Sequence, residues 1–285
     1  MNSLTTPKTV KLKKIIPSGM THLIAIGIAA IAIFPLYLVL VTSFKEQGRI
    51  IIEPLNLPKV WHWENFILAW QKGHFSTYFL NSILVTIPTV FIILTFSLLA
   101  AYVIARKSFP GKNLLFFVFL IGLAIPGDVL IIPLYYDLKA MGLLNTRWAL
   151  ILPAAAFGLS FGILLLRSFI EYLPKEILEA AIIDGCSDWG LLVHIVIHLC
   201  KPALLSLLIF NFMWTWNQFL LPVVLIQKDS MRTLPVGLNY FQGRYVTNVP
   251  LLMAGATIVF LPVVILYIVF QRDFIKGITT GALKS

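Results

Sequence analysis

The sequence predicts an all-α polytopic membrane protein with six transmembrane helices, and three observations support this fold class. The 285 residues are 59% hydrophobic and only 12% charged, with a mean hydropathy of +0.91, whereas soluble domains are about half apolar and a quarter charged. Six apolar runs carry at most one acid each and are long enough to cross a bilayer. The runs are continuously apolar rather than alternating, which excludes a transmembrane barrel, so each run must satisfy its own backbone groups as a helix.

The first apolar run follows a basic N-terminal segment with lysines between residues 8 and 14. This charge pattern is that of a signal peptide, but the run continues without charge to Phe44, which is too long for a signal-peptide core. No small-residue cleavage site ends it, so we expect a retained transmembrane helix. The whole chain, residues 1–285, is predicted to form one transmembrane domain. Its six helices are expected at residues 15–44, 75–105, 113–136, 148–170, 202–227 and 247–271.

The third and fourth helices carry features beyond hydrophobicity. Asp128 is the one acid inside a predicted span, and Pro126-Gly127 directly before it suggests a break in the helix. Acids at membrane depth are costly and usually face a cavity or a polar neighbour. Asp128 is therefore expected either to lie near the outer end of a pathway through the membrane or to pair with another helix. In the fourth helix, Gly158 and Gly162 form a GxxxG pair, which predicts close packing between helices.

The fifth helix places Asn211, Trp214 and Gln218 on one face, at spacings of three and four residues. Polar and aromatic groups together can bind the hydroxyls and the faces of sugars, and they can equally bond a neighbouring helix. This face carries no charge that would fix an ionised ligand. If it lines a pathway, an uncharged ligand is expected first.

Lysine and arginine determine the expected orientation. With the N-terminus inside, 13 of the 22 Lys and Arg residues lie on the inner side, where the loops are also short. Both termini are therefore predicted to be cytoplasmic. The first outer loop, residues 45–72, contains Trp61, Trp63 and Trp70, which suit either an interfacial aromatic belt or a docking surface for an external partner.

A charged, glycine-broken segment separates the fourth and fifth helices, and we call residues 171–201 the inner segment. A proline precedes a short helix expected at residues 175–183, and Gly185 is suited to end it. Ser187 and Asp188 can cap a second short helix. The sequence therefore predicts a helix-turn-helix beyond the membrane.

The order of residues in the inner segment resembles the EAA loop of ABC-importer permeases, the cytoplasmic segment that docks on an ATPase in that family. The matching residues are Glu179, Ala180, Ala181, Asp184, Gly185, Ser187, Ile195, Lys201 and Pro202. The sequence departs from the family pattern at Cys186, where a small residue is usual, and at His198, where proline is usual. The resemblance implies that contact with the ATPase is made by Glu179, Ala180, Ala181, Asp184 and Gly185.

Other segments resemble the carbohydrate branch of the same family, which includes the six-span maltose-transporter permease. These segments are residues 78–82, 132–135, 142–145, 216–219, 232–238 and 276–284. Their order along the chain is that of the family. The resemblance implies a type I ABC importer permease fold. It also implies that Gly277, Thr280 and Gly281 in the C-terminal tail contact the ATPase pair.

By this resemblance, the chain is expected to be a permease that carries a sugar or oligosaccharide across the bacterial inner membrane and is not itself an enzyme. The implied partners are a homologous second permease, two ATP-binding cassette subunits and an extracytoplasmic solute-binding protein. ATP and Mg²⁺ would be bound by the ATPase subunits and no cofactor by this chain. Residues 122–128 imitate the glycine spacing of a P-loop, but Asp128 stands where the phosphate-binding lysine is required.

Other classes of function fit the sequence less well. The net charge of +10 does not indicate a nucleic-acid partner, because the basic residues lie at the ends of apolar runs. The five histidines lack metal-ligand spacing, and no catalytic constellation occurs. An ion-coupled secondary transporter is the rival from another class, but it needs intramembrane charges, and only Asp128 qualifies. A structural membrane scaffold would not require the Glu-Ala-Ala pattern.

Overall fold

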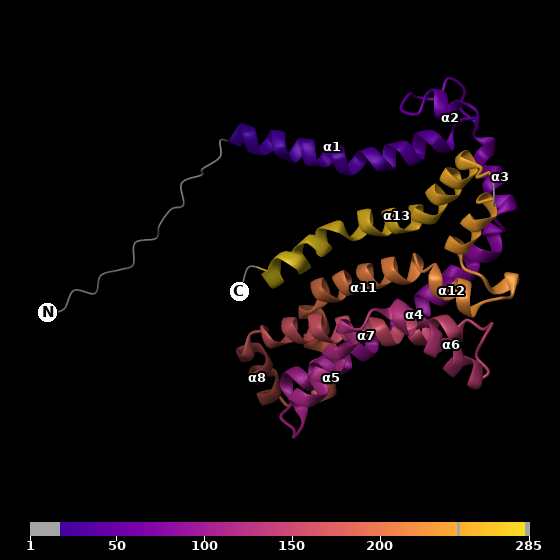
Figure 1. Cartoon of the computed structure of the whole chain (residues 1–285). Coiled ribbons are helices and arrows are strands. Elements are labelled where there is room, and N and C mark those ends of the chain that lie inside the picture. The colour runs from indigo at the N-terminus through magenta and orange to yellow at the C-terminus, as the bar shows by residue number, and fades with distance from the viewer. Residues whose placement is uncertain (1–17, 244–245, 283–285) are drawn as a thin grey trace.

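The computed structural model describes residues 18–243 and 246–282, and within these residues the only extended pairing is one isolated bridge between Gln242 and Thr247. The predicted all-α class is confirmed (Figure 1). The α-helices are α1 Ser18–Ser43, α2 Arg49–Ile52, α3 Glu64–Lys72, α4 Phe75–Arg106, α5 Lys112–Ala124, α6 Ile131–Ala140, α7 Trp148–Glu171, α8 Lys175–Ile183, α9 Asp188–Gly190, α10 Ile197–Leu199, α11 Lys201–Trp216, α12 Leu220–Leu225 and α13 Val249–Ala282. Three short 3₁₀ helices are η1 Gly127–Leu130, η3 Asp229–Met231 and η4 Leu234–Phe241, and η2 Leu191–Val196 is a π-helix.

Four of the described helices are long and apolar enough to cross a membrane by themselves: α1, α4, α7 and α13. Two further candidates are broken, because α5 and the η1–α6 pair meet at 89°, and the helix over residues 188–199 meets α11 at 75°. Counting each bent pair as one span gives six. The structure thus shows several apolar helices, and six is the count if both bent pairs cross.

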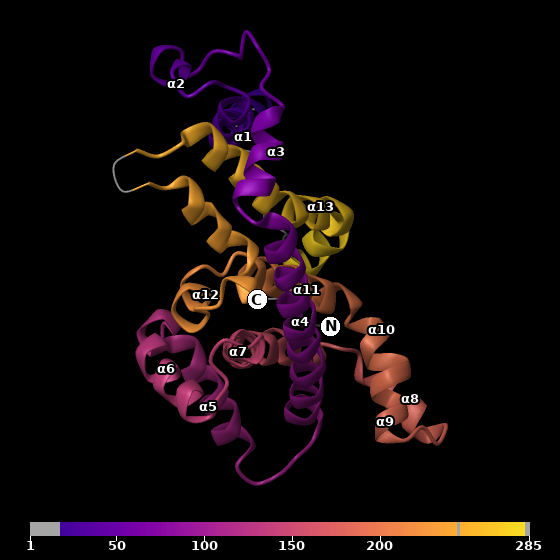
Figure 2. The same cartoon turned by 90° about the vertical axis from the view of Figure 1, so that its right-hand side faces the viewer.

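The long helices lie side by side, with α1 antiparallel to α13 (Figure 1). The start of α1, the end of α13 and α8 lie at one end of the molecule, on the left in Figure 1, whereas α2 and α3 lie at the other end. Seen along the bundle, α4, α7 and α11 occupy the middle (Figure 2). Only 6% of the most apolar window of α1 is buried, so this helix leaves an almost complete apolar surface exposed.

The break in the third predicted span has a local cause. Pro126 disfavours the helical conformation of the preceding residue, and Ile125 is extended with φ −94° and ψ 117°. Helix α5 therefore ends at Ala124, and the chain restarts in a new direction at Gly127. The break that Pro126-Gly127 suggests in the sequence is confirmed.

The fifth predicted span, expected as one helix over residues 202–227, is wrong as a continuous helix. Helix α11 ends at Trp216, and α12 begins only at Leu220. Pro222 explains the interruption, because it lacks an N–H and its ring would clash with the carbonyl of Gln218 in a continuous helix. Gln218 consequently lies beyond the helix that carries Asn211, rather than on its face.

The core of the bundle is the contact between α4 and α7, and the two glycines of α7 allow it. A β-carbon added at Gly158 would collide with Ile93 and Asn211, and one at Gly162 would collide with Ser97. Both glycines are buried. The close helix packing predicted from the GxxxG pair is confirmed.

The first outer loop folds back on the end of α1. The ring of Phe44 contacts Trp61 and Trp63 edge to face, with centroids 5.0 and 4.6 Å apart. Trp61 and Trp63 nevertheless keep 47% and 64% of their surface exposed. Both interpretations of these tryptophans, an interfacial belt and a docking surface, remain predictions.

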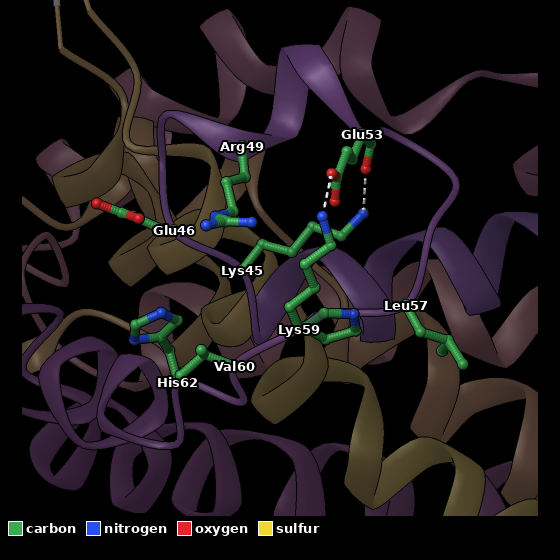
Figure 3. Close-up of a pocket in the computed structure, with 9 residues that line it drawn as sticks. Lys45, Glu46, Arg49, Glu53, Leu57, Lys59, Val60 and His62 are labelled. Atoms are coloured by element: carbon green, nitrogen blue, oxygen red, sulfur yellow. Dashed lines mark hydrogen bonds and ion pairs between the residues drawn. The ribbon is translucent and has the colours of Figure 1, made fainter.

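A buried lysine fixes the shape of this loop. Lys45 is 3% exposed, and its Nζ donates to the carbonyl of Glu53 at 2.7 Å (Figure 3). The same Nζ donates to the carbonyl of Pro54 at 2.9 Å. Burial lowers the pKa of the Lys45 ammonium, and the nearby Glu53 carboxylate partly opposes this. Lys59 pairs with the Glu53 side chain at 2.8 Å across a pocket of about 190 Å³. Glu53 thus connects the loop to both lysines, to Lys45 through its carbonyl and to Lys59 through its side chain.

Candidate functional site

The first short helix of the inner segment has the predicted bounds, Lys175–Ile183. Pro174 precedes it with ψ 122°, so the chain turns sharply after α7. Leu178 is 4% exposed and packs in a cluster with Leu173 and Leu192. One buried leucine therefore anchors α8 to the bundle while most of the helix stays exposed.

Gly185 ends α8 in a left-handed conformation, with φ +82°. Its N–H donates to the carbonyl of Ile182 at 3.0 Å, and the N–H of Cys186 donates to Ala181 at 2.9 Å. These two bonds form a Schellman motif, the usual glycine-dependent helix end. A β-carbon at Gly185 would meet no atom within 4 Å. The requirement for glycine therefore comes from the backbone conformation and not from crowding by neighbours.

The second helix of the inner segment begins at Asp188 and is capped by Ser187, whose Oγ accepts from the N–H of Gly190 at 3.2 Å. Asp188 instead pairs with Lys107 at 2.6 Å, which raises the pKa of the Lys107 ammonium. The helix continues to Leu199 and contains the π-helical turn η2. No sequence pattern predicts this π turn, which places residues 191–196 one step out of the α-helical register.

Most residues that the resemblance assigns to ATPase contact lie at the surface. The exposed ones are Glu179, Ala180, Asp184 and Gly185, whereas Ala181 is half-buried against the core cluster. Ile182 and Ile183 beside them are 57% and 85% exposed. Exposed isoleucines next to acids form a small amphipathic face that is suited to a protein partner.

The inner segment is attached to the ends of two long helices. The guanidinium of Arg106, at the end of α4, donates to the carbonyls of Ile170 and Leu173 at 3.0 and 3.3 Å. Ile170 lies in the last turn of α7 and Leu173 in the link to α8, and Lys107 next to Arg106 holds Asp188. The inner segment is therefore bound on both sides of α8 to the ends of α4 and α7, the pair that forms the core.

The second candidate site is a cavity of about 280 Å³, which we call the polar pocket. It lies where the α5–η1 break, α7 and the end of α11 meet. Its lining residues are Gly122, Leu123, Ile125, Gly127, Asp128, Ala154, Phe157, Gly158, Phe161, Asn211, Trp214, Thr215 and Gln218. All four residues that the sequence singled out as pathway candidates, Asp128, Asn211, Trp214 and Gln218, are among them.

The polar pocket lies at both helix interruptions. Ile125 and Gly127 flank the first break, and Gln218 lies in the second, between α11 and α12. At membrane depth, non-helical backbone is tolerated only where protein buries it or where it lines a wet cavity. Two breaks at one cavity indicate a polar region inside an otherwise apolar bundle.

Asp128 is exposed, and its carboxylate forms no hydrogen bond or ion pair with any other residue in the described part of the chain. Of the two alternatives for Asp128, pairing with another helix of this chain is not observed. It also caps nothing, because η1 has no side-chain cap.

The remaining pathway candidates contribute different groups to the polar pocket. The indole of Trp214 is 55% exposed and meets Phe161 edge to face, with centroids 5.4 Å apart. Asn211 is 1% exposed, and its Nδ2 donates to the carbonyl of Leu207 at 2.9 Å. Gln218 is half-buried and lies beyond α11, yet it reaches the same cavity.

Sequence reasoning missed the aromatic residues that α7 contributes to the polar pocket. Phe157 and Phe161 are four residues apart and line it together with Ala154 and Gly158. The signal was present, because Ala154, Gly158 and Phe161 share one face at spacings of four and three. Of this face, the GxxxG pattern predicts a role only for Gly158, in helix packing.

A polar network connects the loop over residues 228–243 to the start of α4. The hydroxyls of Tyr78 and Tyr240 donate to Asp229 Oδ1 at 2.5 and 2.8 Å. The bond from Tyr78 is the main cause that lowers the pKa of the Asp229 carboxyl. Asn81 donates to the carbonyls of Ser230 and Arg232 at 2.8 and 3.0 Å. The Tyr-x-x-Asn segment that resembles the family pattern thus holds the loop over residues 228–243.

The C-terminal tail continues α13, which runs for 34 residues to Ala282 rather than ending near residue 271. Gly277, Thr280 and Gly281 therefore belong to a helix. Leu283 and Lys284 lie outside the described residues, and the predicted contact of the tail with the ATPase pair stays a prediction. The basic residues before the first helix, at positions 8–14, also lie outside them.

No cluster of His, Cys, Asp or Glu that could hold a metal ion occurs among residues 18–243 and 246–282.

A family profile described as "Binding-protein-dependent transport system inner membrane component" matches residues 93–280. The chain is 36% identical over 269 residues to the diacetylchitobiose uptake system permease protein NgcG of Streptomyces coelicolor, covering 94% of this chain and 89% of that one. It is also 36% identical to the arabinooligosaccharides transport system permease protein AraQ of Halalkalibacterium halodurans, covering 93% and 97%.

The fold has a solved counterpart. A chain in the crystal structure of a bacterial ABC transporter involved in the import of the acidic polysaccharide alginate aligns with a TM-score of 0.76 and 23% identity. The alignment covers 90% of this chain and 96% of that chain. The predicted importer-permease fold is confirmed.

Proposed function

The chain belongs to the family of binding-protein-dependent transport system inner membrane components, and from this premise we propose that it is a permease subunit of an ABC importer for a sugar or oligosaccharide. The family is a transport family and not an enzyme family. The names of these relatives refer to uptake of diacetylchitobiose and of arabinooligosaccharides, which supports a sugar cargo without identifying it.

One structural observation supports a more specific role than membership of the family. Helix α8 presents an exposed amphipathic face, and the residues before and after it are attached to the ends of α4 and α7. Glu179 and Ile183 are exposed, whereas Leu178 is buried. This arrangement suits docking of a moving partner, because the exposed face of α8 is accessible and the segments that flank α8 are attached to the core helices. We assign Glu179, Ala180, Asp184 and Gly185 to contact with an ATPase subunit, with Ala181 supporting them from below.

The mechanism follows from this attachment. ATP closes a pair of ATPase subunits, which displaces α8, and Arg106 and the Lys107–Asp188 pair carry the displacement to α4 and α7. Helix α7 also lines the polar pocket, so the polar pocket and the exposed face of α8 are connected through the same helix. Both sites then bias a single equilibrium between inward-open and outward-open states.

The orientation that we propose places α8 in the cytoplasm. The start of α1 and the end of α13 lie at the same end of the molecule as α8 (Figure 1), which fits cytoplasmic termini. Helix α13, at 1.5 Å per residue, is roughly 51 Å long, well beyond the roughly 30 Å of a hydrocarbon core. Its last turns, with Gly277, Thr280 and Gly281, therefore extend toward the ATPase subunits.

The partners that we propose complete the importer. A homologous second permease covers the exposed side of the polar pocket and part of α1, and a solute-binding protein docks at the end with α2 and α3. We expect ATP and Mg²⁺ to be bound by the two ATPase subunits. In this chain, residues 122–128 form a helix end and a break at the polar pocket. The ion-coupled secondary transporter gains no support from the relatives.

Deletion of the gene for this chain in its host tests the proposal. Uptake of labelled neutral oligosaccharides (an α-glucan trisaccharide, arabinotriose and diacetylchitobiose) is measured in the deletion strain and after complementation. Loss of at least one uptake activity, restored by the intact chain, is expected. Unchanged uptake of every sugar in the panel would contradict a sugar importer.

A further inference from the structure

The lining of the polar pocket carries one charge, and that charge is negative. Among its lining residues, Asp128 is acidic, and none is lysine, arginine or histidine. The other polar groups are the amides of Asn211 and Gln218 and the hydroxyl of Thr215. A ligand that carries a carboxylate or a sulfonate would find no cation here and would be repelled by Asp128.

The lining of the polar pocket contains two acceptor groups, the Asp128 carboxylate and Asn211 Oδ1, and Gln218 and Thr215 add groups that can both donate and accept. The Asp128 carboxylate accepts only, and no partner for it occurs in the described part of the chain. Asn211 already donates through Nδ2 to the carbonyl of Leu207, and its Oδ1 lies beside Gly158, a lining residue. Acceptors at a cavity wall match a ligand with many hydroxyl donors, and a hydroxyl bond to a carboxylate is among the stronger hydrogen bonds.

The aromatic residues of the polar pocket add a flat apolar surface to its lining. Trp214 stands edge to face with Phe161, and Phe157 lies one turn before Phe161 on α7. The volume of about 280 Å³ lies just below the range of roughly 300–1,000 Å³ that is typical of drug-sized ligands. One sugar ring fits such a volume better than a whole oligosaccharide. A neighbouring hollow of about 410 Å³ shares Trp214 and Gln218 and offers space for the next unit.

We propose that the polar pocket is a sugar subsite that this chain contributes to the pathway, selective for uncharged sugar units and closed to uronates, with Asp128 as the residue that determines this selectivity. The inference rests on the proposed sugar import and adds the class of sugar. Asp128 accepts hydrogen bonds from two neighbouring hydroxyls, and Trp214 covers the apolar face of the ring. The desolvation cost of an acid at membrane depth then has a functional reason.

The test measures binding to the purified importer, reconstituted in nanodiscs without its binding protein, by saturation-transfer difference NMR. The first probe is the neutral oligosaccharide that the wild-type importer takes up fastest from the panel above. The second probe is the same sugar with a free primary hydroxyl oxidised to the carboxylate, a uronate. Variants are Asp128→Asn, which keeps the shape, Asp128→Lys, which reverses the charge, and Asp137→Asn, a control at an exposed acid of α6 that does not line the pocket.

The neutral probe is expected to bind the wild type and the Asp137→Asn control alike, and Asp128→Asn is expected to weaken its affinity about tenfold, which corresponds to about 1.4 kcal/mol. The uronate is expected to bind only Asp128→Lys. Equal affinity of the neutral probe for the wild type and Asp128→Asn overturns the inference, as does uronate binding to the wild type. Absence of binding by the neutral probe to the wild type also overturns the inference. The proposed sugar import is contradicted by a different result, namely that the deletion changes the uptake of no sugar in the panel.

Discussion

Gly185 provides a sharp test of how the inner segment is built. Its φ of +82° is favourable for glycine but costs an L-residue with a β-carbon roughly 1–2 kcal/mol. No atom lies within 4 Å of the position of an added β-carbon, so no packing penalty adds to this cost. Gly185→Ala should therefore destabilise only the Schellman turn, by about that amount, and Gly185→Asn should cost less because asparagine tolerates the left-handed region.

A destabilisation of this size opens the turn about 5–30 times more often. Hydrogen exchange followed by mass spectrometry should show faster exchange by that factor at the amides of Gly185 and Cys186, which donate to Ile182 and Ala181. The matched control is Gly48→Ala, since Gly48 has φ −68° and equally open surroundings. Equal exchange in the wild type and Gly185→Ala, or an equal effect at Gly48, would refute the reasoning.

Three further outcomes are expected. Gly158→Leu should lower the thermal stability of the complex by overpacking α7 against Ile93, at a cost of about 1–3 kcal/mol or more, whereas Gly27→Leu on α1, which meets no atom within 4 Å, should leave the melting temperature unchanged. Asp188→Lys should reduce sugar-stimulated ATP hydrolysis, and the charge swap with Lys107→Asp should restore part of it; no recovery would mean that the 2.6 Å pair does not transmit motion. Proteolysis of the outer loop over residues 228–243 should increase as the pH falls below the ordinary aspartate range near 3.9, because Asp229 has a lowered pKa in the folded state and its anchoring is lost on protonation; Asp229→Asn should remove this pH dependence.

Most of the fold could be predicted from the sequence, because the patterns that indicate its helices and turns are local. Apolar runs located the long helices, and α8 has the expected bounds because Pro174 and Gly185 define its two ends. The GxxxG pair of α7 predicted close packing, since nothing larger than glycine fits against Ile93. The signal that predicts each of these features comes from residues that are neighbours in the chain.

The rest could not be predicted because it depends on residues that are distant in the chain. The break after Trp216 is not predicted from the sequence, because the apolar run continues on both sides of it. Pro222 is the one local signal of this break. Asp128 and Trp214 are far apart in sequence, and only the 89° bend at Pro126 and the packing of α7 bring them to one cavity. The attachment of Asp188 to Lys107 likewise joins two loops that no spacing rule connects.

The most direct test of coupling through α8 is the binding-protein-stimulated ATP hydrolysis of the reconstituted importer carrying Glu179→Lys. Glu179 is exposed, so the charge reversal should leave the folding and membrane insertion of this chain intact. Loss of one close charge pair across an interface costs several kcal/mol. Stimulated hydrolysis and uptake should therefore fall at least tenfold, with an intermediate loss for Glu179→Gln. Wild-type stimulation and uptake in an assembled Glu179→Lys importer would contradict the assignment of α8 as the coupling helix.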